Sequence, residues 1–298
     1  MTAASASNRA AAVICGVDGS DESLSAALIG AVLAGAFRID AVAVHAYTEP
    51  TTPHGSQAER ERGRHASRSR ALTTLAECAL KHGLDFELEA RPGEPAAVIE
   101  AVAAERAAPL VAVGSRGRGP FGAAVFGSVS ASLIGSGRQP VLVVPPSAAA
   151  LRTLAGSAVA CVFDGAPESR AATAFAARLS DRLGARLVIL HARAYVPAAA
   201  GALGGVPIAD PELDSGREAI ERVVDRIVHG AAVDHVEAAG VAAPALAEAA
   251  KSEDASLIVV GDSGHGNAVA ALLGPPSRRL AAVGPLPVVA VPPPDEPV

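Results

Sequence analysis

The stretch Val13–Ser20 reads VICGVDGS, and it returns in the second half of the chain as Val159–Ala166, which reads VACVFDGA. Asp18 corresponds to Asp164 in this match, an offset of 146 residues. Five further landmarks repeat in the same order with offsets of 146 or 147: His45 with His191, Gly93 with Gly240, Gly114 with Gly261, Gly117 with Gly264, and Pro140 with Pro287. Six ordered matches with a single one-residue slip predict two copies of one fold. We place the first copy at residues 1–147 and the second at residues 148–298.

Each copy alternates short apolar runs with longer Ala/Leu-rich stretches of helical length. In the first copy we expect strands near 11–17, 41–47, 85–90, 110–113 and 141–144, and helices near 22–35, 60–82, 95–107 and 125–135. This alternation predicts right-handed βαβ units and an α/β fold class, with a five-stranded parallel sheet in each copy and helices on both faces. The stretches Thr48–Arg70 and Tyr195–Asp214 follow the second strand of each copy, and we expect loops or helix entries there.

Composition excludes several classes of protein. Half of the 298 residues are hydrophobic but only 3% are aromatic, so we expect cores of Ala, Val, Leu and Ile. The net charge of −6 argues against a general nucleic-acid binder. No apolar run reaches the roughly 18–20 residues that span a bilayer, and we find no signal segment. Cys15, Cys78 and Cys161 are an odd number without metal-type spacing, which indicates reduced thiols and a cytoplasmic location.

A glycine-rich loop follows the fourth predicted strand of the first copy. Gly114-Ser115-Arg116-Gly117 precedes nine residues and then Gly127-Ser128, a spacing of G-x2-G-x9-G-S. Glycines let the backbone approach a ligand closely, and free amide N–H groups at a helix start form an anion site. We expect Ser128 at the N-cap, where its hydroxyl adds a donor. Arg116 and Arg118 are expected to meet phosphate charge or to lie in solvent.

Several segments of the chain resemble the pattern of the universal stress protein family. The resemblance rests on Gly16–Ser20, His45-Ala46, Gly93–Pro95, Val113–Gly117 and Gly127–Val129, and it covers nearly the whole chain twice. It implies two tandem Rossmann-like domains of the adenine nucleotide alpha hydrolase type. These domains would form an intramolecular pseudo-dimer, with the last strands meeting across a pseudo-two-fold axis. A homodimer of chains is compatible with the same resemblance.

By this resemblance the first copy holds ATP, with or without Mg²⁺. Asp18 is expected to contact the adenosine, and the backbone of Ala46 to face the adenine. The residues expected around the ribose and phosphates are Val113, Gly114, Gly117, Gly127, Ser128 and Val129. Structural roles remain open for several of these positions: Asp18 as a helix cap or turn residue, Gly93 and Pro95 as turn and helix-start residues, and His45 and His191 as ends of buried strands.

The second copy departs from the pattern. Its candidate site residues are Asp164, Ala192, Gly261, Gly264 and Gly274. Pro275-Pro276 stands where Ser-Val is expected, so two amide donors and a hydroxyl are lost together. Asp262 adds a negative charge to the loop, which Arg278 and Arg279 offset only in part. We therefore expect the second copy to bind nucleotide weakly or not at all.

The expected function is adenine-nucleotide binding by a sensor or regulator in stress or dormancy physiology. Hydrolysis is expected to be slow at most, because no positioned general base or metal carboxylate cluster is visible. One alternative is a nucleotide-free interaction module with vestigial sites. Another is an adenylating or ATP pyrophosphatase-type enzyme, whose phosphate loop Gly16–Ser20 only partly resembles. The G-x-G-x-x-G match at Gly117–Gly122 follows the fourth strand and contains Pro120, so it does not indicate a dinucleotide site.

Overall fold

The computed structural model describes residues 10–48, 57–82, 86–115, 127–145, 154, 156–194, 217–229, 232–240, 242–262 and 286–294. The first copy contains β1 (Ala12–Gly16), α1 (Asp21–Phe37), β2 (Asp40–Tyr47), α2 (Gln57–His82), β3 (Glu87–Pro92), α3 (Pro95–Glu105), β4 (Val111–Gly114), α4 (Ser128–Ser136) and β5 (Val141–Val144). The second copy contains β6 (Ala158–Val162), α5 (Pro167–Leu183), β7 (Arg186–Ala194), α6 (Arg217–Val228), β8 (Val233–Gly240), α7 (Ala242–Ser252), β9 (Ala255–Gly261) and β10 (Val288–Val291).

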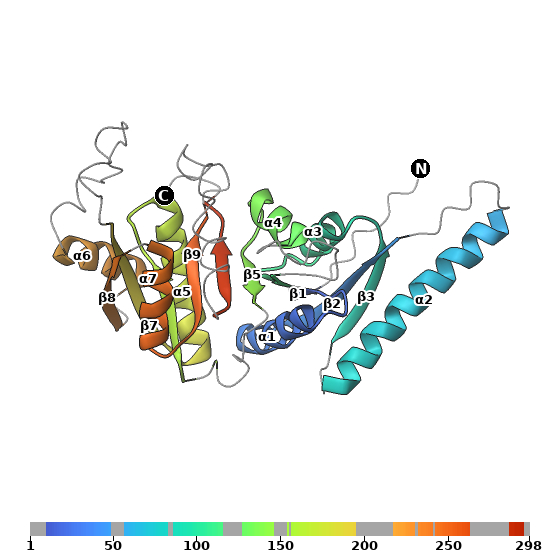
Figure 1. Ribbon diagram of the computed structural model, residues 1–298, viewed down its shortest axis with the longest axis horizontal. Helices are drawn as coiled ribbons and strands as arrows, with labels where there is room; N and C mark the ends of the chain where they lie inside the picture. Colours follow the sequence, from blue (N-terminus) through green and yellow to red (C-terminus); the bar gives the residue numbers. More distant parts are fainter. Residues whose placement is uncertain are drawn as a thin grey trace.

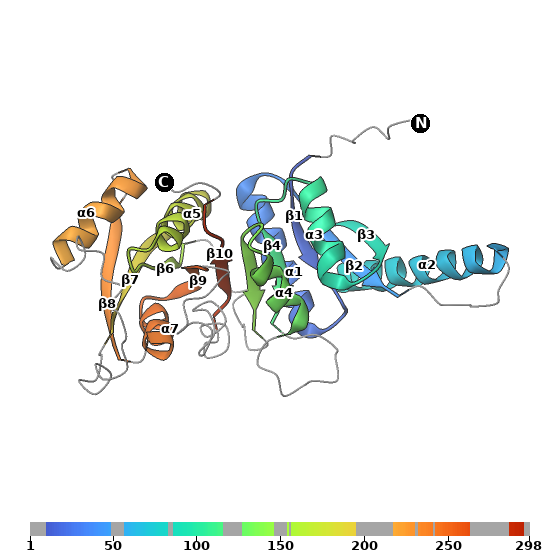
Figure 2. The ribbon, with the colours of Figure 1, turned by 90° about the horizontal axis from the view of Figure 1, so that it is seen from above.

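One ten-stranded sheet runs through both copies in the order β3-β2-β1-β4-β5-β10-β9-β6-β7-β8. The five strands of each copy are parallel to one another, as the alternation of elements predicted. The two halves join where β5 pairs antiparallel with β10, with Val143 opposite Val288. Strands β3 and β8 form the two outer edges (Figures 1 and 2).

Helices cover both faces of the sheet, and a separate core lies under each face. The side chains of β1 alternate between the two cores: Val13 and Cys15 face one, and Ala12 and Ile14 face the other. The first core is closed by α1, α5 and α6, and the second by α3, α4 and α7. Strands buried on both faces explain why the central runs of sequence are continuously apolar. Within the described segments, no helix has the combination of length and hydropathy that crossing a bilayer requires.

The helix boundaries follow local capping chemistry. Ser20 caps α1, where its hydroxyl accepts a hydrogen bond from the amide of Ser23 at 3.3 Å. Glu94 caps α3 by accepting from the amide of Ala97 at 2.9 Å, and Pro95 occupies the first helical turn. Gly93 has φ of 139°, a conformation that favours glycine. Gly93 is therefore a turn residue and Pro95 a helix-start residue, the structural roles that the sequence analysis gave as alternatives to ligand binding.

The stretch after β2 divides into two parts. Residues 49–56 lie outside the described part of the chain, and α2 begins at Gln57, earlier than the expected start near residue 60. The Arg/Glu-rich part of Thr48–Arg70 is therefore largely a helix entry rather than a loop. Its counterpart at Tyr195–Asp214 lies outside the described residues.

An ionic cluster occupies the same corner of each copy, where the second and third strands begin. In the first copy Arg106 makes two hydrogen bonds to Glu87, at 2.9 and 2.7 Å, and these are the chief cause that raises the pKa of Arg106. In the second copy Arg186 lies 2.6 Å from Asp234 and 3.8 Å from Glu253.

The repeat offsets show that the two clusters are permuted versions of each other. Asp234 corresponds to Glu87, Glu253 to Arg106, and Arg186 to Asp40, whose charge also raises the pKa of Arg106. The three aligned positions thus hold two carboxylates and one arginine in each copy, but the arginine comes from a different element.

Burial of the core thiols predicts an alkaline loss of stability. Cys15 and Cys161 are fully buried, and burial raises the pKa of each thiol to about 12. In the unfolded chain these thiols ionise near pH 8.5, so between about pH 9 and 12 only the unfolded state releases the protons. The free energy of unfolding should therefore fall as pH rises through this window, by up to about 1.4 kcal/mol per pH unit for each thiol.

Urea denaturation at a series of pH values measures this slope. The matched control is the double variant Cys15→Ala/Cys161→Ala, which should be less stable at neutral pH but lose less stability between pH 9 and 11. Equal slopes in the two proteins would show that other groups cause the alkaline dependence.

Candidate functional site

Those predicted nucleotide-binding residues of the first copy that the structure describes gather at the C-terminal edge of its sheet. Strands β1 and β4 are neighbours, with Cys15 opposite Ala112. Asp18 follows the end of β1, and Gly114 is the last residue of β4. In a parallel sheet the C-terminal ends lie at one edge, where ligands of open α/β folds bind. The structure therefore brings the Asp-Gly-Ser segment and the start of the glycine loop to the same place.

Asp18 is held in the turn that opens α1. Its Oδ1 accepts hydrogen bonds from the amide of Ser20 at 2.9 Å and from the hydroxyl of Ser20 at 2.6 Å. The amide of Asp18 donates to the hydroxyl of Ser23 at 3.3 Å, and that hydroxyl donates to the carbonyl of Ser20 at 2.9 Å. The carboxylate of Asp18 thus stabilises the turn that precedes α1. This is the structural role that the sequence analysis gave as an alternative to contact with adenosine.

The ends of the glycine loop are fastened to the sheet and to each other. The amide of Ser115 donates to the carbonyl of Val144 on β5 at 2.8 Å, and the carbonyl of Ser115 accepts from the amide of Gly127 at 2.6 Å. These hydrogen bonds place Gly127 beside Ser115, so the two ends of the glycine loop meet at the C-terminal edge of the sheet. Residues 116–126, including Arg116, Gly117 and Arg118, lie outside the described part of the chain.

Helix α4 starts where the loop returns, so its first backbone amides lie at the sheet edge. The N-cap is Gly127, without a side-chain cap, and Ser128 is the first helical residue. The expectation of Ser128 at the N-cap was therefore wrong by one position, because Gly127 is still extended (φ −72°, ψ 153°). The first amides of a helix have no partner within that helix. Those of Ser128 and Val129 fit an anion site at this edge.

Apolar side chains line the same side of the sheet. Ala46, near the end of β2, and Val129 pack against the core that contains Val113. A Cβ on Gly16 would lie 2.7 Å from Cδ1 of Ile99 and 3.0 Å from Cγ1 of Val113. A side chain at position 16 would therefore have to displace Ile99 and Val113, so Gly16 allows the close packing of β1, α3 and β4, a role that the sequence analysis did not assign.

His45 and His191 occupy equivalent positions but have different partners. Nδ1 of His45 lies 2.7 Å from the carbonyl oxygen of Val17, so this nitrogen is the donor and it links β2 to the end of β1. His191 is buried; its Nε2 lies 3.2 Å from Nδ1 of His235, and the two rings stack with centroids 5.5 Å apart. Phe163 meets the ring of His191 edge-on. These contacts are consistent with structural roles for both histidines.

The second copy preserves the turn but differs in the loop. Oδ1 of Asp164 accepts from the amide of Ala166 at 3.0 Å, which parallels the turn at Asp18. Asp262 occupies the position of Ser115: its amide donates to the carbonyl of Val291 at 2.8 Å, and the residue is 3% exposed. A carboxylate thus lies buried at the start of this loop. Ala192 lies on β7 opposite Ala238. Gly264, Gly274, Pro275, Pro276, Arg278 and Arg279 lie outside the described residues.

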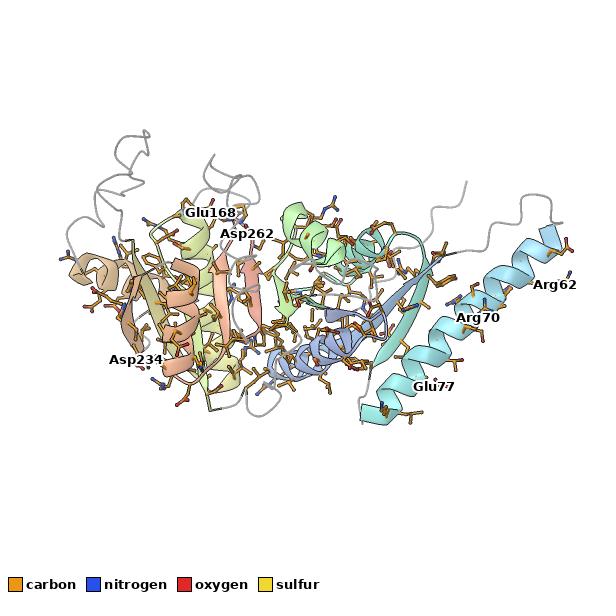
Figure 3. The ribbon with its side chains drawn as sticks, viewed as in Figure 1. Arg62, Arg70, Glu77, Glu168, Asp234 and Asp262 are labelled. Carbon is orange, nitrogen blue, oxygen red and sulfur yellow. The ribbon has the colours of Figure 1, made fainter. Side chains whose placement is uncertain are left out.

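Gly261 permits a close approach between β9 and the first turn of α5. A Cβ at this position would lie 2.6 Å from the carbonyl oxygen of Glu168 and 2.7 Å from the amide nitrogen of Ser169. Figure 3 shows Glu168 and Asp262 at the same end of this copy. The sequence analysis named Gly261 as a candidate site residue of the second copy, and its environment adds a packing role. Among the described residues, no group of three or more His, Cys, Asp or Glu side chains is arranged to hold a metal ion.

The duplicated α/β fold, with a glycine loop at the C-terminal edge of the first sheet, defines this protein as a tandem Rossmann-like α/β protein. A family model described as "Universal stress protein family" matches the chain twice, at residues 11–145 and 157–292. The chain belongs to the universal stress protein family, whose role is in the stress response and whose members are generally regulatory rather than enzymatic.

Relatives and solved structures agree with this assignment. The chain is 32% identical over 250 residues to a universal stress protein of Mycolicibacterium smegmatis, covering 80% of this chain and 79% of that protein. It is 28% identical over 285 residues to universal stress protein Rv2005c of Mycobacterium tuberculosis, covering 93% and 95%. The crystal structure of a universal stress protein from Archaeoglobus fulgidus matches with a TM-score of 0.64 at 18% identity, over 96% of this chain and 98% of that chain, which shows a shared fold.

The environment of Gly261 predicts the effect of adding one methyl group. Gly261→Ala should lower the free energy of unfolding by about 1–3 kcal/mol, because the new Cβ meets backbone atoms that cannot rotate away. The control is Gly35→Ala in α1, where a Cβ meets nothing within 4 Å. That change should raise stability by up to about 1 kcal/mol, because alanine favours helix more than glycine does. Chemical denaturation measures both, and an unchanged midpoint for Gly261→Ala would contradict the packing role.

Proposed function

We propose that the first copy binds an adenine nucleotide, ATP, at the C-terminal edge of β1 and β4. The observation that carries this proposal is the closure of the glycine loop at Ser115 and Gly127, which brings the amides at the start of α4 to this edge. In the proposal those amides and the loop hold the phosphates. The residues proposed to bind ATP are Asp18, Ala46, Val113, Gly114, Gly117, Gly127, Ser128 and Val129.

The proposed role is that of a cytoplasmic sensor or regulator that hydrolyses ATP slowly or not at all. Binding without turnover needs only preformed hydrogen-bond donors, whereas hydrolysis also needs a positioned base or a metal that orients water. If Mg²⁺ takes part, we expect it to bind together with ATP as the Mg²⁺–ATP complex. Product analysis of protein incubated with ATP and Mg²⁺ measures this directly, and rapid turnover would contradict a regulatory role.

For the second copy we propose weak nucleotide binding or none. Asp262 is buried at the position of Ser115, where its negative charge opposes phosphate. Pro275 and Pro276 lack the amide donors that Ser128 and Val129 provide. These differences favour a structural or interaction role for this copy, with Asp164, Ala192, Gly261, Gly264 and Gly274 as remnants of a site.

We further propose that the two copies, divided between residues 147 and 148, act as an intramolecular pseudo-dimer. The antiparallel pairing of β5 with β10 supports this proposal, because it relates the two copies through their last strands. In a two-fold arrangement each copy presents the same strand to the other.

Equilibrium dialysis with labelled ATP tests the proposed function. We expect about one nucleotide per chain. Gly117→Leu should abolish binding while leaving the chain folded, because a side chain there obstructs the approach of phosphate to the backbone. The matched control is Gly264→Leu, the same change at the equivalent position of the second copy, which should leave binding unchanged.

Three outcomes would contradict the proposals. Unchanged affinity in a folded Gly117→Leu protein would remove the proposed site. Two nucleotides per chain with equal affinities would contradict the assignment of the second copy. An absence of any binding would favour the alternative of a nucleotide-free interaction module.

A further inference from the structure

The parallel ladder between β1 and β2 stops at the C-terminal edge of the sheet, beside the candidate site. Its register ends at Gly16 opposite Val44. One more backbone hydrogen bond follows, because the amide of Val17 donates to the carbonyl of Val44 at 2.9 Å. In a parallel pair these hydrogen bonds are evenly spaced. The next hydrogen bond of the ladder would therefore run from the amide of Ala46 to the carbonyl of Val17.

The side chain of His45 takes the place of that next hydrogen bond. Its Nδ1 lies 2.7 Å from the carbonyl oxygen of Val17. Val17 is 6% exposed, so its carbonyl depends on a donor from the protein. Because a carbonyl oxygen can only accept, Nδ1 carries the proton, and the neutral imidazole is sufficient. The imidazole thus satisfies the carbonyl that the ladder would otherwise pair with the amide of Ala46.

The amide of Ala46 is the backbone group that this arrangement leaves over. Ala46 lies two residues after Val44, whose carbonyl faces β1, and alternate residues of a strand direct their backbone groups to the same neighbouring strand. Within the described parts of β1 and β2 the register stops at Gly16 and Val44, so the amide of Ala46 has no partner in this ladder. The residue is half-buried and lies at the edge where ligands of open α/β sheets bind.

The second copy uses the equivalent imidazole in another way. The amide of Phe163, the counterpart of Val17, donates to the carbonyl of Leu190 at 3.0 Å, so the backbone hydrogen bond is kept. Nε2 of His191, however, lies 3.2 Å from Nδ1 of His235. The ring of Phe163 meets the ring of His191 edge-on. The two copies therefore share the end of the ladder but differ in the partner of the imidazole.

We propose that His45 is a positioning residue that keeps the amide of Ala46 available to donate a hydrogen bond to a ring nitrogen of adenine. This inference rests on the proposed ATP site of the first copy. An amide donor suits adenine, because the unprotonated ring nitrogens of this base are hydrogen-bond acceptors. His45 acts through Val17 and Ala46 and does not itself touch the nucleotide.

Hydrogen exchange of the Ala46 amide, followed by NMR on the full chain, tests this step directly. In the wild-type protein without nucleotide we expect exchange without protection, and ATP should slow it. In His45→Leu the buried carbonyl of Val17 loses its donor and should accept from the amide of Ala46 instead. Exchange of this amide without nucleotide should then slow at least about tenfold.

The affinity for ATP, measured by equilibrium dialysis, is the second readout. His45→Leu should raise the Kd about three- to tenfold, the range expected for the loss of one hydrogen bond. His45→Asn should restore both the exchange rate and the Kd, because its side-chain amide offers an N–H donor at the position of Nδ1. A role in packing alone would not give this rescue. The matched control is His191→Leu, which should leave both readouts unchanged.

Several results would overturn the proposal. These are an Ala46 amide already protected in the free wild-type protein, a bound ATP that does not protect it, and a His45→Leu protein with unchanged exchange and affinity. Equal behaviour of His45→Asn and His45→Leu would remove the role of the N–H donor. A wild-type protein that binds no ATP would overturn the proposed function and the contact with adenine. The exchange rates of the free protein need no nucleotide, so they distinguish that failure from a failure of His45 to hold the carbonyl of Val17.

Discussion

The antiparallel pairing of β5 with β10 is the contact on which the arrangement of the whole molecule depends. It makes one continuous sheet from two parallel ones, and it turns the C-terminal edges of the two copies in opposite directions. The two strands also anchor both loops: the amide of Ser115 donates to Val144 on β5, and the amide of Asp262 donates to Val291 on β10. Both candidate sites are therefore built directly on the strands that join the copies.

Much of the fold follows from the sequence because it depends on local patterns. Buried strands read as continuous apolar runs, and the repeat shows that the alternation of elements occurs twice. Contacts between distant residues give no such signal. Glu87 and Arg106 lie 19 residues apart, and Arg186 and Asp234 lie 48 apart, so neither pair could be read from spacing. The N-cap of α4 was expected at Ser128, one residue too late, because the extended backbone of Gly127 forms the cap without a side-chain hydrogen bond.

The candidate site was predictable only in part. Its location followed from the glycine spacing, since a loop between a strand and a helix must lie at the C-terminal edge of a parallel sheet. The individual roles of its glycines did not follow. Gly16 and Gly261 resemble ligand-contacting residues in sequence, yet each lies where another element approaches closely: the side chain of Ile99 in one case and the backbone of Glu168 in the other. Only the three-dimensional environment separates these two uses of glycine.

The permuted ionic corners make the two halves of the chain incompatible in detail. The arginine follows α3 in the first copy and begins β7 in the second, while carboxylates fill the other two positions. Gene conversion that replaced the codon of Arg186 with that of Asp40 would place three carboxylates together. The reciprocal exchange would place a second arginine beside Arg106, where Asp40 now contributes a carboxylate. Electrostatic repulsion at one corner thus opposes the homogenisation that duplicated genes otherwise undergo, and the halves can diverge into separate roles.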